Sequence, residues 1–132
     1  MARKKEVKKA TLESLIERAQ QRKEAKADYK EYFCETIGET LLIKKLPLTR
    51  ICEILDMYET DTMKEAMELN SQVIYESVPL LQKRELQDAY ECIEPYDIVV
   101  KLLDENMGEI EKLCKTILAG YGMAELADDI KN

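Results

Sequence analysis

The chain contains no histidine, and its four glycines form none of the glycine-rich patterns that cradle phosphates. Without histidine, neither a Ser-His-Asp triad nor a Cys-His dyad can be built. Without a GxGxxG or GxxxxGK pattern, the common nucleotide-binding loops are excluded. Carboxylates do cluster between residues 56 and 65, but their spacing is typical of an acidic helix surface. The sequence therefore predicts no catalytic residue, no cofactor and no enzymatic activity.

The chain has only four cysteines, and none of them forms a Cys-x-x-Cys pair. A zinc site would have to draw its soft ligands from scattered thiols, so we expect no metal centre. A reducing cytosol also disfavours disulfides. The four cysteines are expected to be small apolar residues, mostly buried. Cys52 and Cys114 stand at helical core spacing, which fits that expectation.

Long apolar runs are missing too. No stretch approaches the ~18 residues of a membrane span. The basic segment from Met1 to Lys9 is not followed by the apolar region of a secretory signal. These absences predict a soluble protein that stays in the cytoplasm where it is made and has no membrane partner.

Charge is divided unevenly along the chain. Residues 1–30 hold ten Lys/Arg and five Asp/Glu, which gives +5, and residues 31–132 hold ten and twenty-two, which gives −12, for a total of −7. An acidic body repels a phosphate backbone, so we expect no nucleic-acid partner. A DNA-associated regulator that acts through the basic arm is an alternative, and salt-dependent DNA retention would favour it.

With 132 residues, of which 45% are hydrophobic and 36% charged, the chain has the size and composition of one globular domain. We expect a disordered basic N-terminus over residues 1–10 and a single domain over residues 11–122. A flexible acidic C-terminal tail is expected over residues 123–132.

The first third of the chain predicts one helix and one hairpin. Thr11 can cap a helix whose apolar positions, Leu12, Leu15, Ile16 and Ala19, recur at helical spacing and then fade. Residues 32–37 and 41–46 are β-prone and flank Gly38, so we expect a β-hairpin.

Helical patterns follow. One helix is expected after Pro47, one opens with the capping box Thr62-x-x-Glu65, and a short one spans residues 80–90. A continuous apolar stripe over residues 96–119 predicts a long last helix, which Gly108 could kink or break. The fold class is therefore α+β, mainly α, with an N-terminal β-hairpin followed by a helical bundle with a long C-terminal helical segment.

What remains is surface for binding a partner. Tyrosines outside the helix stripes offer large contact area at small entropy cost, and methionines can line an adaptable groove. The alternative is that the tyrosines cap the edge of the core and the methionines fill gaps within it. The candidate partner-binding residues are Tyr75, Tyr90, Tyr96, Met63, Met67 and Met107.

Three segments in the second half carry a family resemblance: Tyr75-Glu76-Ser77-Val78-Pro79, Leu86-Gln87-Asp88-Ala89-Tyr90 and Glu94-Pro95-Tyr96-Asp97-Ile98-Val99. Residues 106–110 and 121–122 continue the pattern, and residues 42–48 match it upstream. The chain resembles the XkdN-like tail assembly chaperones of contractile-tailed bacteriophages and prophages over roughly residues 32–122. The first strand and the more basic N-terminal helix depart from the pattern.

The resemblance implies a binding function. Such proteins are thought to coat the long tape measure protein and keep it soluble in the host cytoplasm, and they look absent from the mature particle. Coating a long client implies self-association, and in many relatives a ribosomal frameshift adds a longer minor form. The alternative is a structural tail or baseplate component of a phage, prophage or tail-like bacteriocin.

Overall fold

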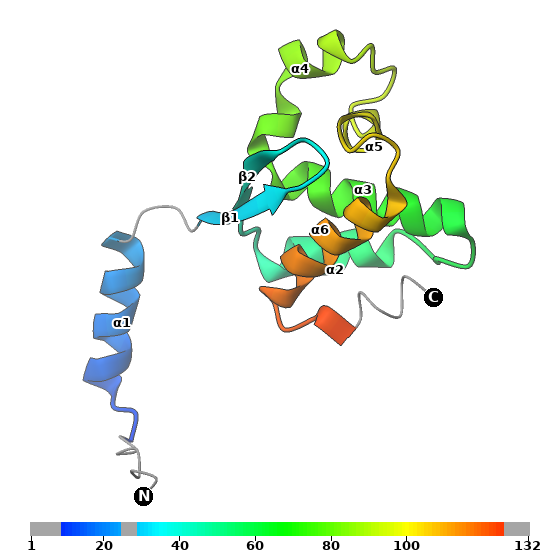
Figure 1. Cartoon of the computed structure of the whole chain (residues 1–132). Coiled ribbons are helices and arrows are strands. Elements are labelled where there is room, and N and C mark those ends of the chain that lie inside the picture. Colours follow the sequence, from blue (N-terminus) through cyan, green and yellow to red (C-terminus); the bar gives the residue numbers. More distant parts are fainter. Residues whose placement is uncertain (1–8, 25–28, 126–132) are drawn as a thin grey trace, which may run out of the picture.

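The computed structural model describes residues 9–24 and 29–125 (Figure 1). The elements are α1 (Leu12–Glu24), β1 (Tyr29–Cys34), β2 (Glu39–Lys44), α2 (Leu48–Asp56), α3 (Met63–Ser77), the 3₁₀ helix η1 (Pro79–Gln82), α4 (Arg84–Ala89), α5 (Asp97–Leu102) and α6 (Met107–Ala119). The predicted class, α+β and mainly α with one hairpin, is confirmed. The disorder predicted for residues 1–10 and 123–132 falls mostly on positions outside the described residues.

The hairpin begins earlier than the sequence pattern indicates, at Tyr29 rather than Tyr32. Its turn spans residues 35–38, where the Gly38 N–H donates to the Cys34 carbonyl at 2.8 Å and Gly38 has φ of +69°. Glycine adopts that left-handed conformation without steric cost. One face of the sheet is buried, through Tyr32 and Cys34 on β1 and Leu41 and Ile43 on β2.

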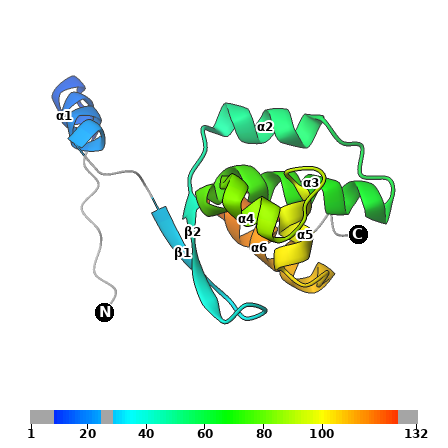
Figure 2. The same cartoon turned by 90° about the horizontal axis from the view of Figure 1, so that it is seen from above.

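Helix α3 is the centre of the domain. Figure 2 shows it between α2 and α6, and it also packs against α5 and η1. Residues 69–74 are all buried, as expected of a helix surrounded by other elements. The predicted capping box begins this helix, because the Thr62 hydroxyl accepts the Glu65 N–H at 3.1 Å.

The last helical segment is broken rather than continuous. Helix α5 ends at Leu102, and Asp104 and Glu105 adopt φ of 58° and 56°, which a right-handed helix cannot contain. Asn106 then caps α6, accepting the Glu109 N–H at 3.2 Å. The expected break at Gly108 was wrong in position, because Gly108 lies within the first turn of α6.

Helix α1 contributes nothing to this core. The predicted cap is confirmed, since Thr11 Oγ1 accepts the Ser14 N–H at 3.0 Å. Every residue of α1 is exposed, and Figures 1 and 2 show the helix standing clear of the other elements.

The cysteines divide between core and surface, and all four are free thiols. Cys34 and Cys114 are buried, Cys92 is half-buried and Cys52 is exposed. The expectation for Cys52 was wrong, because α2 turns Ile51 and Ile54 into the core and leaves Cys52 facing away. Across the described residues, the longest apolar helices fall short of what a membrane crossing requires.

Candidate partner-binding groove between α3 and α5

A surface groove of about 320 Å³ lies between the N-terminal part of α3 and the beginning of α5. Its lining comes from three stretches of chain that are far apart in sequence, which the packing of α3 against α5 brings together. The lining residues are Tyr58, Lys64, Met67, Glu68, Ser71, Glu94, Tyr96, Asp97 and Val100.

The aromatic part of the groove is built on two tyrosines. The rings of Tyr75 and Tyr96 meet edge to face, with centroids 4.8 Å apart and planes at 81°. Tyr75 is fixed in turn because its hydroxyl accepts a hydrogen bond from Gln87 Nε2 at 3.2 Å. Tyr96 keeps 40% of its surface exposed. A partner therefore meets a ring that is already oriented, which lowers the entropic cost of binding.

Tyr58, which also lines the groove, is held by a chain of polar contacts. The Tyr58 hydroxyl donates to Gln72 Oε1 at 2.6 Å, and Gln72 Nε2 donates to Glu76 Oε2 at 3.0 Å. Arg50 donates to both oxygens of Glu76 at 2.7 Å, and this bidentate contact holds the pKa of Glu76 below its usual range. The network fixes α2 and the loop after it against α3.

The rim of the groove is acidic. The lining holds three carboxylates, those of Glu68, Glu94 and Asp97, and one cationic side chain, that of Lys64. Asp97 is held in place because its Oδ2 accepts the Glu94 N–H at 3.0 Å. Ser71 adds a buried hydroxyl that has no hydrogen-bond partner among the described residues. The groove is suited to an apolar side chain flanked by lysine or arginine.

The structure brings together three of the six predicted binding residues. Met67 and Tyr96 line the groove and Tyr75 supports Tyr96. The other three lie outside its lining: Met63 and Tyr90, which are exposed, and Met107, half-buried at the start of α6.

Sequence reasoning missed Tyr58 and the rim carboxylates. Glu94 and Asp97 are close neighbours of Tyr96 in the sequence, so the choice of Tyr96 as a binding residue could have pointed to both carboxylates. Tyr58 follows α2 in a loop and offered no periodic pattern that would have singled it out.

A second polar centre joins the hairpin to α6. The buried carboxylate of Glu109 accepts hydrogen bonds from the Tyr32 hydroxyl at 2.6 Å, the Cys34 thiol at 3.3 Å, and the Thr36 N–H and hydroxyl at 3.0 and 2.9 Å. Four donors from the hairpin thus converge on one side chain of α6.

Electrostatics follow from that geometry. Burial by itself would raise the pKa of Glu109, but the hydrogen bonds from Tyr32, Thr36 and Cys34 outweigh it and lower the pKa to about 2. Burial and the adjacent carboxylate raise the pKa of both the Tyr32 hydroxyl and the Cys34 thiol. The ionised carboxylate and protonated donors make this a structural tether, because no group here is poised to exchange a proton near neutral pH.

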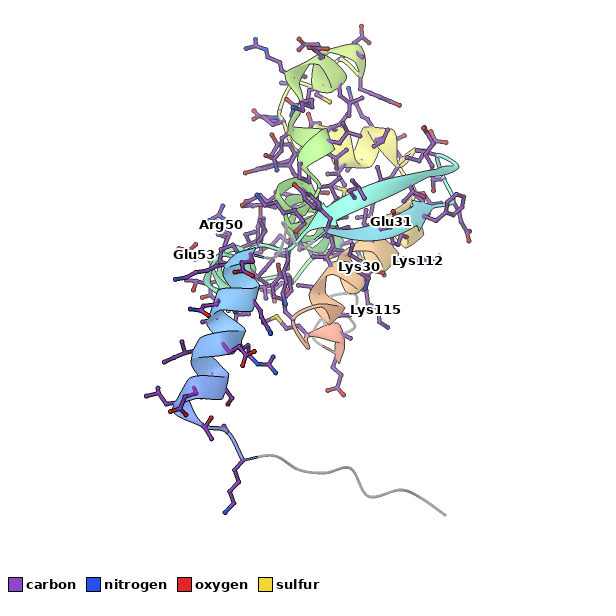
Figure 3. The ribbon with its side chains drawn as sticks, turned by 90° about the vertical axis from the view of Figure 1, so that its left-hand side faces the viewer. Lys30, Glu31, Arg50, Glu53, Lys112 and Lys115 are labelled. Atoms are coloured by element: carbon purple, nitrogen blue, oxygen red, sulfur yellow. The ribbon has the colours of Figure 1, made fainter. Side chains whose placement is uncertain are left out.

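The side of the molecule in Figure 3 carries charges of both signs. The labelled residues come from β1, α2 and α6 and are Lys30, Glu31, Arg50, Glu53, Lys112 and Lys115. Arg50 lies 3.6 Å from Glu53, and Lys112 lies 4.0 Å from Glu35. This mixture opposes the single-sign field that attracts a phosphate backbone.

Comparison of the chain with protein-family models, curated proteins and solved structures finds no match. Within the described part of the chain, no three Cys, Asp or Glu side chains are grouped so that they could hold a metal ion.

Proposed function

We propose that this protein is a tail assembly chaperone that binds the tape measure protein in the host cytoplasm and is left out of the finished particle. The observation that supports the proposal most is the position of Tyr96. It belongs to the segment that resembles the XkdN-like chaperones, and it lies in the groove between Glu94 and Asp97 of the same segment. A motif that has no catalytic chemistry thus lines a surface suited to binding.

The groove fits one face of an amphipathic helix, the form expected of a long helical client. An apolar side chain of the client would contact Met67, Tyr96 and Val100, whose surfaces line the groove. Basic residues one turn away on the client would meet Glu68 and Asp97 on the rim. Binding would bury apolar surface on the client that otherwise drives its aggregation.

Co-expression tests the proposal directly. A tape measure protein from the same genome should give more soluble product and a co-purifying complex when it is expressed together with this chain. A tape measure protein that is equally soluble when expressed alone would remove the need for a chaperone and contradict the proposal.

A matched pair of tyrosines tests the groove. Tyr96 and Tyr90 are 40% and 39% exposed, but only Tyr96 lines the groove. Tyr96→Ala should weaken client binding by roughly 10-fold or more, as loss of an aromatic anchor does, whereas Tyr90→Ala should change it little. Titration calorimetry with a client fragment measures both. Equal losses for the two variants would place the binding surface elsewhere.

The second candidate is a structural tail or baseplate component. The surface contacts that bind a client could also join tail subunits, so the groove alone does not separate the two functions. Purified particles distinguish them, because a chaperone is absent from the particle and a structural subunit is present in fixed copy number.

A further inference from the structure

Helix α1 presents an apolar stripe that no other described residue covers. Leu12, Leu15 and Ile16 are 72%, 54% and 50% exposed. They recur at the spacing that places them on one face of a helix. Large apolar side chains gathered on one exposed face are typical of an interaction surface.

The stripe is bordered by opposite charges. Arg18 and Arg22, four residues apart, adjoin it on one side, where they line a shallow hollow together with Leu15. Glu13 and Glu17, also four residues apart, follow the other side at 100° per residue. The helix thus has a basic edge and an acidic edge.

The hairpin presents a second uncovered apolar face, opposite the one that packs on the helices. Tyr29, Phe33 and Leu42 are 48%, 58% and 49% exposed and share this outer face by strand alternation. Leu42 pairs with Glu31, so it lies diagonally between the two aromatic rings. Glu31 carries negative charge on the β1 side of the face, and Lys44 carries positive charge on the β2 side.

We propose that two copies of this chain exchange their α1 helices, the apolar stripe of each covering the outer hairpin face of the other. The basic edge of α1 then lies over Glu31 and the acidic edge over Lys44. This single contact covers both apolar surfaces and places each charged edge of α1 over a residue of opposite charge.

The area buried favours a reciprocal exchange. At their exposed fractions and roughly 200 Å² for a large apolar residue, the six side chains of one contact remove about 650 Å² from water. That is below the ~1,200 Å² at which specific interfaces begin, whereas two symmetric contacts reach it. A single α1–hairpin contact between two copies would therefore be weak.

The connector favours exchange over closure within one chain. Four residues, numbers 25–28, separate Glu24 from Tyr29. For α1 to fold back onto the hairpin of its own chain, the chain would have to reverse direction within those four residues, and so short a connection favours exchange between copies. The proposal does not depend on the chaperone function, because it uses neither the groove nor a client.

Sedimentation velocity on the full chain, from about 1 to 100 µM, tests the exchange. The unaltered protein should show a reversible monomer–dimer equilibrium. Leu15→Asp and Phe33→Asp should each weaken association by at least about 10-fold, because each buries a charge in the contact. Both side chains are exposed in the monomer, so helical content by circular dichroism should stay unchanged.

Charge reversal adds a matched test. Glu31→Arg and the pair Arg18→Glu with Arg22→Glu should each weaken the dimer, and the combination should restore it at least in part. Glu85→Arg on the exposed surface of α4 is the control and should leave association unchanged.

Two results would overturn the proposal. The first is a monomer over the whole concentration range, and the second is a dimer that is unaffected by both Leu15→Asp and Phe33→Asp. If the protein is a monomer whose Arg18 and Arg22 bonds resist trypsin, that protection indicates closure of α1 on its own chain.

Discussion

At the scale of single residues, Glu109 has the greatest influence on the fold. It is a charged side chain on α6 that is 7% exposed, and its carboxylate accepts hydrogen bonds from Tyr32, Cys34 and Thr36 of the hairpin. A two-stranded hairpin is marginally stable by itself, so its attachment to helices decides whether it forms. Glu109 supplies the polar half of that attachment, and the buried face of the hairpin supplies the apolar half.

Glu109→Gln should lower the free energy of unfolding by roughly 2–4 kcal/mol. The amide is neutral, and its NH₂ group, which can only donate, would face the hydrogen-bond donors of the hairpin. Urea unfolding at pH 7 measures the change. Tyr32→Phe, which removes one donor and keeps the ring, should cost less, at about 1–2 kcal/mol. A loss below about 0.5 kcal/mol for Glu109→Gln would show that the hairpin is held by apolar contacts alone.

Acid should weaken the same tether. The folded pKa of Glu109, about 2, lies below its ordinary value of 4.5, so the carboxylate contributes stability that is fully present above about pH 5. That stability, on the order of 3 kcal/mol, is lost as the pH falls from 4.5 toward 2. Between pH 7 and pH 2 the free energy of unfolding should therefore fall more for the unaltered protein than for Glu109→Gln. Identical pH profiles would contradict the shift.

At the scale of elements, the break between α5 and α6 shows how two residues redirect a helix. Asp104 and Glu105 both have positive φ, and each conformation costs roughly 1–2 kcal/mol for a residue with a side chain. The turn places α6 along α3, where Ile110, Leu113 and Ile117 complete the core.

Glycine should relieve that cost. Glu105→Gly removes the left-handed penalty and adds roughly 0.5–1 kcal/mol of backbone entropy to the unfolded chain, so we expect a net gain of up to about 1 kcal/mol. Thermal unfolding measures it, with Lys112→Gly on the exposed side of α6 as the control that should destabilise by about 1 kcal/mol. A destabilised Glu105→Gly variant would mean that the side chain makes a needed contact.

Elements with local signals were predictable from sequence. Helices α2 and α3 start where Pro47 and the Thr62 capping box indicate, because those signals act within one turn. The α5–α6 break was misplaced although the sequence held local signals for it, since Asn106 is a preferred N-cap residue and Asp104 is of a type that tolerates the left-handed conformation.

Long-range partners were not predictable. Glu109 follows its cap in the pattern of a solvent-facing helix residue, and its main donor, Tyr32, lies 77 positions away. In the groove, Tyr96 and Met67 were singled out by residue type, but Tyr58 and Glu68 join them only through the packing of α3. Spacing along the chain carries no information on such contacts.

At the scale of the whole molecule, the described residues form a domain with a core and a helix outside it. Because no residue of α1 is buried, deleting residues 1–24 should leave the thermal midpoint within about 2 °C. The measurement belongs at low protein concentration, where association between copies adds nothing to stability. A larger drop would show that α1 is packed on the domain in solution.

The Glu109 tether also has a consequence for the order of events on the ribosome. Tyr32 is made 77 residues before Glu109, and at about 5–20 residues per second the nascent hairpin waits roughly 4 to 15 s for its partner. During that interval its apolar inner face has neither α6 nor the carboxylate to cover it. A translational pause placed before the α6 codons would lengthen this exposure and lower the yield of folded protein, whereas a pause after those codons would not.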